Sequence, residues 1–560
     1  ATFAAMPTQS GHLGLISQSG ALGIAVLAAA QDCGLAPSQF VSVGNKADVS
    51  GNDLLLAWEH DERTRVIALY LESFGNPRKF ARIARRVAAR KPVIAIKAGR
   101  SNAGKRAGTS HTAAAAASDV VVDALFTQAG VLRVGTMQQM LDVARVLSEQ
   151  PLAAGPRVAI VGNSGGPGIL AADAAESAGL TVVELPAATR RLLEAAVPAI
   201  ASSQNPVDLG AGAGADRVGP AIDILLQAAE VDSVLAVFTD TAVSVPEDVM
   251  DRIARCAANG DKPVVATRVG APASSLPMAG TAYSLPVFTF PEAAAEALAL
   301  AHRYARIKAV TPAPLARPTA IDGERGRAIV TAALAAGTEW LSPDDAVALL
   351  KAYGIPICPQ RVVASTDEAV TAAAELGYPL AVKLAGGGTH KTDLGGVRLG
   401  VADEGALIAA VTDLQLLQGG SPSVLLQPMA KPGVEVIVGA IQDQSVGPVV
   451  MLGMGGVLSD LIADRTFRLA PLGPDDAEAM LADLRLARLL DGYRGGAVVS
   501  HAAVADVVVR VAELAADLPE VAELDLNPLI GNADGLLAVD ARIRVAAAGP
   551  TPDPVLRQLR

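Results

Sequence analysis

The sequence predicts an α/β fold with two parallel-sheet domains in tandem, followed by a third region of mixed strands and helices. Over residues 13–150, short apolar runs alternate with turn residues and helical patterns, which is typical of βαβ units. The same rhythm restarts at Arg157, and the pattern changes again from Leu341. A length of 560 residues allows three or four domains of this kind.

The first domain is expected to contain at least three buried parallel strands. Leu13–Ile16, Val66–Tyr70 and Pro92–Ile96 are largely apolar and of strand length. Each run is followed by turn residues and then by a helical pattern. Strands that are covered by helices on both faces are expected to be apolar throughout, as these are.

The second domain begins with the strand Val158–Val161, which leads into a glycine-rich turn and a helix. The helix is expected to run to about Ala178, because Gly179 is placed to end it. Later strands are expected at Ser233–Phe238 and Pro263–Thr267.

The stretch from Val310 to about Gly326 is rich in Pro, Ala and Arg and has little periodicity, so it predicts a linker. Ser342 followed by Pro343 predicts the start of a helix, with Ser as the N-cap and Pro at the first helical position. The expected boundaries are a first domain over 1–152, a second over 153–308, a linker over 309–337, a third domain over 338–548 and a loose tail over 549–560.

Composition excludes several classes of function. The net charge of −11 gives no electrostatic reason to bind nucleic acid. No run of about 18 apolar residues predicts a membrane span, and no signal peptide is recognisable. Cys33, Cys256 and Cys358 lack metal-site spacing and are expected to be buried thiols in a reducing compartment. We therefore expect a soluble cytoplasmic protein.

Two matched strand–turn–helix junctions open the two α/β domains. Such a junction directs backbone N–H groups and the positive end of a helix dipole toward one point, which suits a phosphate. Tight packing between strand and helix is the alternative explanation, at about even odds. The expected phosphate-binding residues are Ser17, Ser19 and Gly20 in the first turn, and Asn163, Ser164, Gly165 and Gly166 in the second.

His111 is one of only six histidines and lies in a basic, glycine-punctuated stretch of small residues. A neutral imidazole is a competent nucleophile near physiological pH. Glu72 follows a strand end, where open α/β sheets place their ligand crevices, and could accept an N–H from His111. Taken alone, His111 is better explained as an incidental histidine on a surface loop, and Glu72 can also be explained as a solvated glutamate.

The third region contains residues suited to nucleotide chemistry. Lys383 emerges from an apolar strand, where an unused charge would be costly, and His390 lies in a second glycine-rich loop. Glu523, Asp525 and Asn527 alternate with apolar residues and share one strand face. Asn527 and Asp540 are predicted to bind Mg²⁺ through oxygen, whereas Glu523 is interpreted as an exposed face residue.

These motifs together resemble the NDP-forming acyl-CoA synthetases, relatives of succinyl-CoA synthetase, over roughly residues 10–545. Five segments match in order: residues 17–23 (SQSGALG), 110–112 (SHT), 205–208 (NPVD), 390–397 (HKTDLGGV) and 525–529 (DLNPL). The resemblance implies two flavodoxin-like, doubly wound domains followed by an ATP-grasp domain with its lid at about 360–425.

The resemblance also implies residue roles and a reaction. His111 matches the phosphorylated histidine, Glu72 the glutamate that steadies it, and His390 a second phosphohistidine of some members. The implied nucleotide-binding residues are Lys383, Gln427, Met429 and Glu435, with Asn527 and Asp540 as Mg²⁺ ligands. The implied reaction is acid + CoA + ATP ⇌ acyl-CoA + ADP + phosphate, with a short-chain acid such as acetate and an acyl phosphate intermediate. A homodimer is expected by analogy.

Three departures accompany the resemblance. No Rossmann-type CoA-binding domain precedes Gly11, so we expect a truncated chain or one subunit of two, which binds CoA poorly without that domain. Ala113 replaces a common glycine, and Asp460 replaces a usual glutamate. A ligand-sensing module of an N-acetyltransferase fusion is the alternative function, disfavoured because both histidines are present. A biotin-carboxylase-like enzyme is disfavoured because it lacks the tandem domains.

Overall fold

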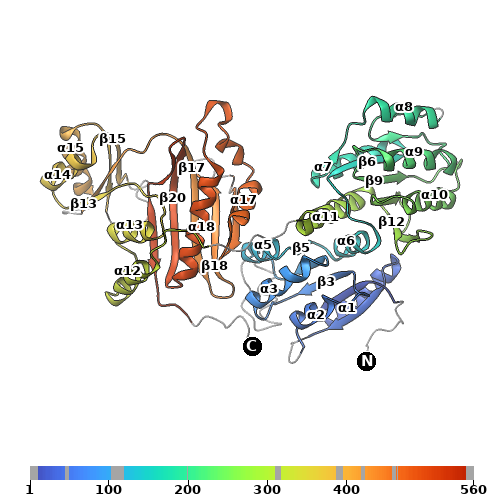
Figure 1. Cartoon of the computed structure of the whole chain (residues 1–560), viewed down its shortest axis with the longest axis horizontal. Coiled ribbons are helices and arrows are strands. Elements are labelled where there is room, and N and C mark those ends of the chain that lie inside the picture. Colours follow the sequence, from blue (N-terminus) through green and yellow to red (C-terminus); the bar gives the residue numbers. More distant parts are fainter. Residues whose placement is uncertain are drawn as a thin grey trace. The chain divides into compact units, whose positions relative to one another are not determined.

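The computed structural model describes residues 10–44, 49–101, 119–197, 200–309, 317–385, 395–417, 423–456, 462 and 464–549. The chain forms two compact units, unit 1 within residues 1–311 and unit 2 within residues 312–556 (Figure 1). No helix among the described residues combines the length and apolar character needed to cross a membrane.

Unit 1 begins with the parallel sheet that the sequence predicts, and this sheet has five strands in the order β2-β1-β3-β4-β5. Buried side chains, most of them apolar, fill its three central strands, because helices cover both faces. The strands are β1 (Leu13–Ser17), β2 (Pro37–Ser42), β3 (Val66–Leu71), β4 (Val93–Lys97) and β5 (Leu132–Arg133). The helices are α1 (Gly20–Asp32), α2 (Gly51–Trp58), α3 (Pro77–Ala88), α5 (Asp119–Gln128) and α6 (Met137–Glu149).

The second sheet of unit 1 has the order β11-β12-β10-β9-β6-β7, with β8 paired to β6 and only β11 antiparallel. Its strands are β6 (Arg157–Gly162), β7 (Thr181–Val182), β8 (Val207–Asp208), β9 (Ser233–Phe238), β10 (Val264–Arg268), β11 (Ser274–Pro277) and β12 (Ser284–Phe288). Its helices are α7 (Gly165–Ser177), α8 (Ala187–Ala196), α9 (Ala215–Gln227), α10 (Pro246–Ala258) and α11 (Pro291–Ala309). The helix expected after β6 is confirmed, and Gly179 follows it with a positive φ of 89°.

The two sheets of unit 1 share one hydrophobic core. Side chains of α6 and α11 pack together between them, and residues of both sheets contribute, among them Leu15 and Ile160 (Figure 1). The two α/β domains are therefore joined by a common layer of helices and form one compact body.

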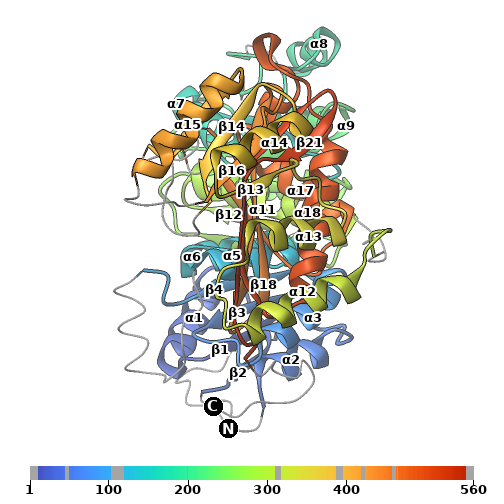
Figure 2. The same cartoon turned by 90° about the vertical axis from the view of Figure 1, so that its left-hand side faces the viewer.

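Unit 2 contains two antiparallel sheets, which agrees with the ATP-grasp expectation. The smaller sheet has the order β13-β16-β14-β15 and is covered by α14 and α15 (Figure 2). Its elements are β13 (Arg361–Val363), α14 (Thr366–Leu376), β14 (Leu380–Leu384), β15 (Val397–Val401), α15 (Glu404–Leu417) and β16 (Val424–Pro428). These residues fall where the lid is predicted.

The larger sheet of unit 2 has the order β19-β18-β17-β20-β21, with β22 paired to β20. Helix α18 packs along β17 and β18 and closes a core that also includes α12, α13 and α17. The strands are β17 (Val434–Asp443), β18 (Gly447–Met454), β19 (Arg465–Leu469), β20 (Val521–Asn532), β21 (Gly535–Ala538) and β22 (Ala541–Val545). The helices are α12 (Gly323–Ala335), α13 (Pro343–Ala352), α17 (Pro474–Asp483) and α18 (His501–Asp517), with short 3₁₀ turns at Ala487–Leu490 and Tyr493–Gly495.

The linker predicted over 309–337 is too long, because α12 occupies most of its second half. The Asp322 side chain accepts a hydrogen bond from the backbone N of Arg325 and caps this helix. Val330 is buried in the core of unit 2, and Gly326 leaves room for the ring of Tyr353. The buried face of α12 is made largely of small side chains, so its helical period is weak in the sequence.

Candidate active site

The first turn uses its serine side chains to shape the start of α1. The Ser17 hydroxyl is buried, donates to the backbone O of Ser19 at 2.6 Å and accepts from the backbone N of Ser19 at 3.2 Å. Ser19 is the N-cap of α1. The first amides of a helix have no intrahelical acceptor, so the N–H groups from Gly20 onward are suited to an anion. Ser17 and Ser19 therefore support the predicted phosphate turn mainly by holding its backbone.

Gln18 connects this turn to the loop that carries Glu72. Its Oε1 accepts from the backbone N of Glu72 at 2.7 Å and of Ser73 at 2.9 Å, and its Nε2 donates to the Ser73 carbonyl at 2.8 Å. All three bonds cross from the end of β1 to the end of β3. Gln18 lies within a matched motif, but the sequence pattern did not predict a role for its side chain.

Glu72 is half-buried directly beyond the carboxyl end of β3. Burial raises the pKa of the Tyr70 hydroxyl, and the negative charge of Glu72 adds to that rise, so the carboxylate lies close to Tyr70. His111, its predicted partner, lies outside the described residues, as does Ala113. The contact between Glu72 and His111 therefore stays a prediction.

The second turn differs from the first in what its side chains do. The buried carboxamide of Asn163 donates to the Thr239 carbonyl at 2.8 Å and accepts from the Thr239 backbone N at 2.9 Å. Both amide atoms of this side chain join the ends of β6 and β9, so Asn163 positions the turn. Phosphate binding by the turn's backbone N–H groups stays a prediction.

The start of α7 is open but has an acid beside it. Gly165 and Gly166 are exposed, and a Cβ at Gly166 would meet no atom within 4 Å. A Cβ at Gly165 would lie 3.5 Å from Oδ2 of Asp208, whose Oδ1 accepts from the Gly210 backbone N at 2.8 Å. Ser164 is the N-cap, and its side chain makes no capping hydrogen bond. This turn therefore offers amides, a half-buried hydroxyl and a nearby carboxylate in a space with room for a ligand.

Lys383 joins the two sheets of unit 2. It lies on β14, its side chain is largely buried, and its Nζ donates to the carbonyl of Val539 at 3.0 Å, directly before Asp540. A buried ammonium is costly unless its charge is used, which agrees with a phosphate-binding role. His390 and Asp460 lie outside the described residues.

The other predicted nucleotide-binding residues lie on β16 of the smaller sheet, directly after it, and on β17 of the larger sheet. Gln427 is buried in β16, and its Nε2 donates to Oε1 of Gln360 at 2.9 Å. The backbone N of Met429 donates to the Pro379 carbonyl at 2.9 Å. Met429 is partly exposed and begins the short connection from β16 to β17, the strand that contains Glu435.

Glu435 is exposed on β17 and lies beside a glycine pair. The backbone N of Gly455 donates to the Glu435 carbonyl at 2.8 Å. A Cβ at Gly455 would lie 2.7 Å from the Cβ of Glu435, and one at Gly456 would lie 3.8 Å from its Oε2. Any side chain at position 455 would therefore displace Glu435.

Asn527, in the middle of β20, lies beside Asp540, which is in the connection between β21 and β22. The backbone N of Asn527 donates to the Asp540 carbonyl at 3.3 Å. Asp525 shares the strand face of Asn527, and its pKa is raised by burial and by the charges of Asp540 and Glu523. Glu523 accepts from Nε of Arg544 at 3.4 Å, which agrees with its interpretation as a face residue. The sequence places Asp525 on the same strand face as Asn527, and its burial near Asp540 makes it a further candidate oxygen donor.

This group of oxygen atoms fits Mg²⁺. Asp525, Asp540 and Asn527 offer two carboxylates and one amide, and burial, followed by the charge of Asp540, raises the pKa of Asp525. A hard divalent cation bound by these oxygens would offset both effects. The described residues contain no group of three or more His, Cys, Asp or Glu side chains placed to hold a metal ion. A site completed by phosphates and water is the kind that Mg²⁺ occupies.

Comparisons with known proteins decide the family. Three family models match in sequence: a succinyl-CoA ligase like flavodoxin domain over 10–147, a ligase-CoA domain over 158–310 and an ATP-grasp domain over 332–545. The acetate–CoA ligase (ADP-forming) I of Archaeoglobus fulgidus is 34% identical, covering 97% of this chain and 79% of that protein. The chain belongs to the ADP-forming acyl-CoA synthetases.

Other members of this synthetase family differ in acid and in subunit division. The 4-hydroxybutyrate–CoA ligase (ADP-forming) of Nitrosopumilus maritimus is 30% identical, with the same two coverages. A solved acetyl-CoA synthetase 1 of Ca. Korarchaeum cryptofilum, in complex with phosphate and ADP, is 32% identical with a TM-score of 0.49, over 54% of this chain and 66% of that one. Some members are divided into alpha and beta subunits. The chain is thus an ADP-forming acid–CoA ligase with an ATP-grasp nucleotide-binding domain.

Proposed function

We propose that this synthetase activates a short-chain acid such as acetate through an acyl phosphate, with His111 as the phosphoryl carrier. The γ-phosphoryl group of ATP passes to His390 as ADP leaves, and from there to the imidazole of His111. The acid's carboxylate oxygen then takes the phosphoryl group from His111, and the CoA thiolate displaces phosphate from the acyl carbon. The observation that carries this proposal is the triple hydrogen bond of Gln18, which fixes Glu72 beside the first phosphate-type turn.

Each unit-1 residue has a separate role in this proposal. Glu72 accepts an N–H of the His111 ring, selects its tautomer and stabilises its charged form. The amides at the start of α1, from Gly20 onward, balance negative charge on the phosphoryl group during transfer. Gly165 and Gly166 leave room beside α7 for the acid, and Ser164 supplies a hydroxyl.

Unit 2 supplies the nucleotide half of the reaction. Lys383 places its ammonium at Val539, in the connection between β21 and β22 that also contains Asp540, and Glu435 lies beside the glycine pair at 455 and 456. Asp540 and Asn527, together with Asp525, would hold Mg²⁺, which would supply positive charge against the phosphates of the nucleotide.

We propose that His390 also carries the phosphoryl group, before it reaches His111. Because the acyl site and the nucleotide site lie in different domains, a histidine near the nucleotide would accept the group first and pass it to His111. Both histidines lie outside the described residues, so this order rests on their positions in the motifs and on the family.

Small side chains and few aromatic residues favour a short acid. Aromatic residues make up 3% of the chain, and the second turn contributes two exposed glycines. Acetate is named for the Archaeoglobus relative, whereas the Nitrosopumilus relative is named for 4-hydroxybutyrate. A panel of acids, assayed for ADP release that depends on both acid and CoA, tests this choice.

Labelling with γ-³²P-ATP and Mg²⁺ tests the carrier. We expect label on the protein that is lost in acid and stable in base, as for phosphohistidine. His111→Ala should still label and His390→Ala should not, if His390 is loaded first. His60→Ala is the matched control, because His60 is exposed and far along the chain from both motifs, and it should label like the native protein. No label on a protein that binds ATP would overturn the proposal and favour a ligand-sensing role.

A further inference from the structure

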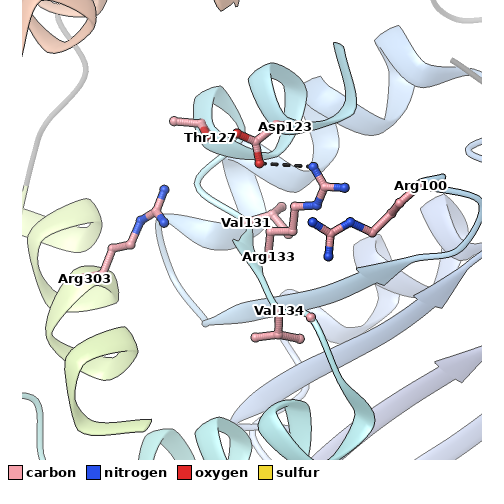
Figure 3. Close-up of a pocket in the computed structure, with 8 residues that line it drawn as sticks. Arg100, Asp123, Thr127, Val131, Arg133, Val134 and Arg303 are labelled. Carbon is pink, nitrogen blue, oxygen red and sulfur yellow. Dashed lines mark hydrogen bonds and ion pairs between the residues drawn. The ribbon is translucent and has the colours of Figure 1, made fainter. Parts of the chain in front are cut away.

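A cavity of about 220 Å³ in unit 1 is lined by three arginines (Figure 3). Arg100 follows β4, Arg133 belongs to β5, and Arg303 comes from α11 of the second sheet's helix layer. In Figure 3, Arg303 lies on one side of the cavity, and Arg100 and Arg133 lie on the other. Three separate elements therefore bring guanidinium groups to one hollow.

The three arginines are not equally engaged. Arg133 is largely buried and pairs with both Asp119 and Asp123, with 3.2 Å between its Nη1 and Oδ1 of Asp123. Its charge is thus balanced, and it serves as a fixed wall of the cavity. Arg100 makes only a long contact, 3.8 Å from its Nε to Oδ2 of Asp119, and its side chain is 55% exposed.

Arg303 has no ion-pair partner in the part of the chain that the structure describes. It is exposed on α11, yet it lines the cavity together with Arg100. Among the described residues, the three guanidinium groups at this cavity lie near two carboxylates, those of Asp119 and Asp123. Arg303, and Arg100 with its long contact to Asp119, are therefore the two that are placed to bind an anion.

The size and chemistry of the cavity select a small oxyanion. Guanidinium groups bind phosphate oxygens through paired N–H donors, and Thr127 adds a hydroxyl to the lining. A volume of about 220 Å³ is below the usual range for a whole drug-sized ligand, so it suits one phosphoryl group. Arg100 and Arg133 stand at the ends of β4 and β5, whereas the proposed catalytic turn and Glu72 belong to β1 and β3.

We propose that Arg303 and Arg100 form a second phosphate-type anion site, separate from the catalytic turns. The site takes either free phosphate or the phosphoryl group of a small phosphate ester. An anion held there would compete with Asp119 for Arg100, because both bind the same guanidinium. This inference does not depend on His111 or on the acid substrate.

Equilibrium dialysis of the full chain against ³²P-orthophosphate, without nucleotide, tests the site. We expect Arg303→Ala to lose one saturable phosphate site, or to bind at least tenfold more weakly there, with an unchanged melting temperature. Arg306→Ala is the matched control, because Arg306 is also exposed on α11 but does not line the cavity. It should keep the native number of sites. Displacement of the Arg303-dependent phosphate by adenosine 3′,5′-bisphosphate would identify an ester as the ligand, and its retention would identify the free anion.

Two results would overturn the proposal. One is native stoichiometry and affinity in Arg303→Ala, and the other is an equal loss in Arg306→Ala, which would mean a general effect of surface charge. Arg303→Lys sharpens the test, since it keeps the charge but not the paired donors, and should fall between the native protein and Arg303→Ala. Failure here would leave the labelling at histidine untouched.

Discussion

At the scale of single residues, Gln18 is the side chain on which the proposed acyl site depends most. Its carboxamide makes three hydrogen bonds to the backbone of Glu72 and Ser73, so it acts like an additional stretch of sheet between two strand ends. It touches no reacting atom in this scheme and is a positioning residue. Its effect should therefore appear in the step that needs Glu72, and not in ATP binding.

Replacing Gln18 with Leu should lower kcat by roughly ten- to a hundredfold, because the loop loses three hydrogen bonds of about 1 kcal/mol each and leaves backbone groups unpaired. KM for ATP should stay near its native value, since the nucleotide residues belong to unit 2. Steady-state kinetics of ADP release measures both constants. Gln18→Glu is the control: it keeps an acceptor for the two N–H groups and should retain more activity than Gln18→Leu. A matched rise in KM for ATP would argue against a positioning role.

A second residue-scale prediction concerns the oxygen donors of unit 2. Asp540→Asn should raise the Mg²⁺ concentration needed for half-maximal labelling by about tenfold, because one carboxylate of a small donor set loses its charge. Glu523→Gln changes a neighbouring acid that is paired with Arg544, and it should shift this concentration little. Titration of labelling against Mg²⁺ distinguishes them, and equal shifts in both variants would place the ion elsewhere.

At the scale of elements, the sequence predicted what apolar pattern and turn chemistry determine. Buried parallel strands such as Ser233–Phe238 were located because every position is apolar or small. The helix α12 was missed because small residues on its buried face hide the helical period. The side-chain hydrogen bonds of Asn163 could not be predicted, since its partner Thr239 is 76 residues away and no local pattern reveals that bond.

A second element-scale point concerns how the stability of unit 1 depends on pH, through a buried carboxyl group between its two sheets. Glu149, at the end of α6, lies beside the buried Arg145 and accepts from Oγ of Ser275 on β11 at 2.8 Å. Burial outweighs the attraction of Arg145 and raises the pKa of Glu149 to about 7. Asp142 on the same helix and Cys33 at the end of α1 also face Arg145, and burial raises the pKa of each.

The raised pKa of Glu149 determines whether its contribution to stability rises or falls with pH. The folded state favours protonated Glu149, so this group's contribution to stability is present at low pH and is lost as pH rises from about 4.5 to about 7. Glu149→Gln cannot ionise, so its melting temperature relative to the native protein should rise across that interval. Glu296→Gln, an exposed change on α11, is the control and should give a flat difference. A flat difference for Glu149→Gln as well would show that this carboxyl titrates at its ordinary pKa.

At the scale of the whole molecule, the chain has two compact units, and each contains its own set of candidate site residues. Unit 1 presents the turns and Glu72, and unit 2 presents Lys383, Glu435 and the oxygen donors. The motifs in the sequence point to most of these residues, but not to a role for Gln18, which depends on its hydrogen bonds to the backbone of Glu72 and Ser73. Phosphoryl transfer by histidine is the step that would join the two sets into one reaction.

Chasing the label off the protein tests this central claim most directly. The chain is labelled with γ-³²P-ATP and Mg²⁺, freed of nucleotide and divided into two portions. We predict that ADP returns the label as ATP, and that acetate with hydroxylamine removes it while forming an equal amount of acetohydroxamate. Label that neither ADP nor any acid of the panel removes, or label that is lost in base, would contradict a phosphohistidine that carries the group between nucleotide and acid.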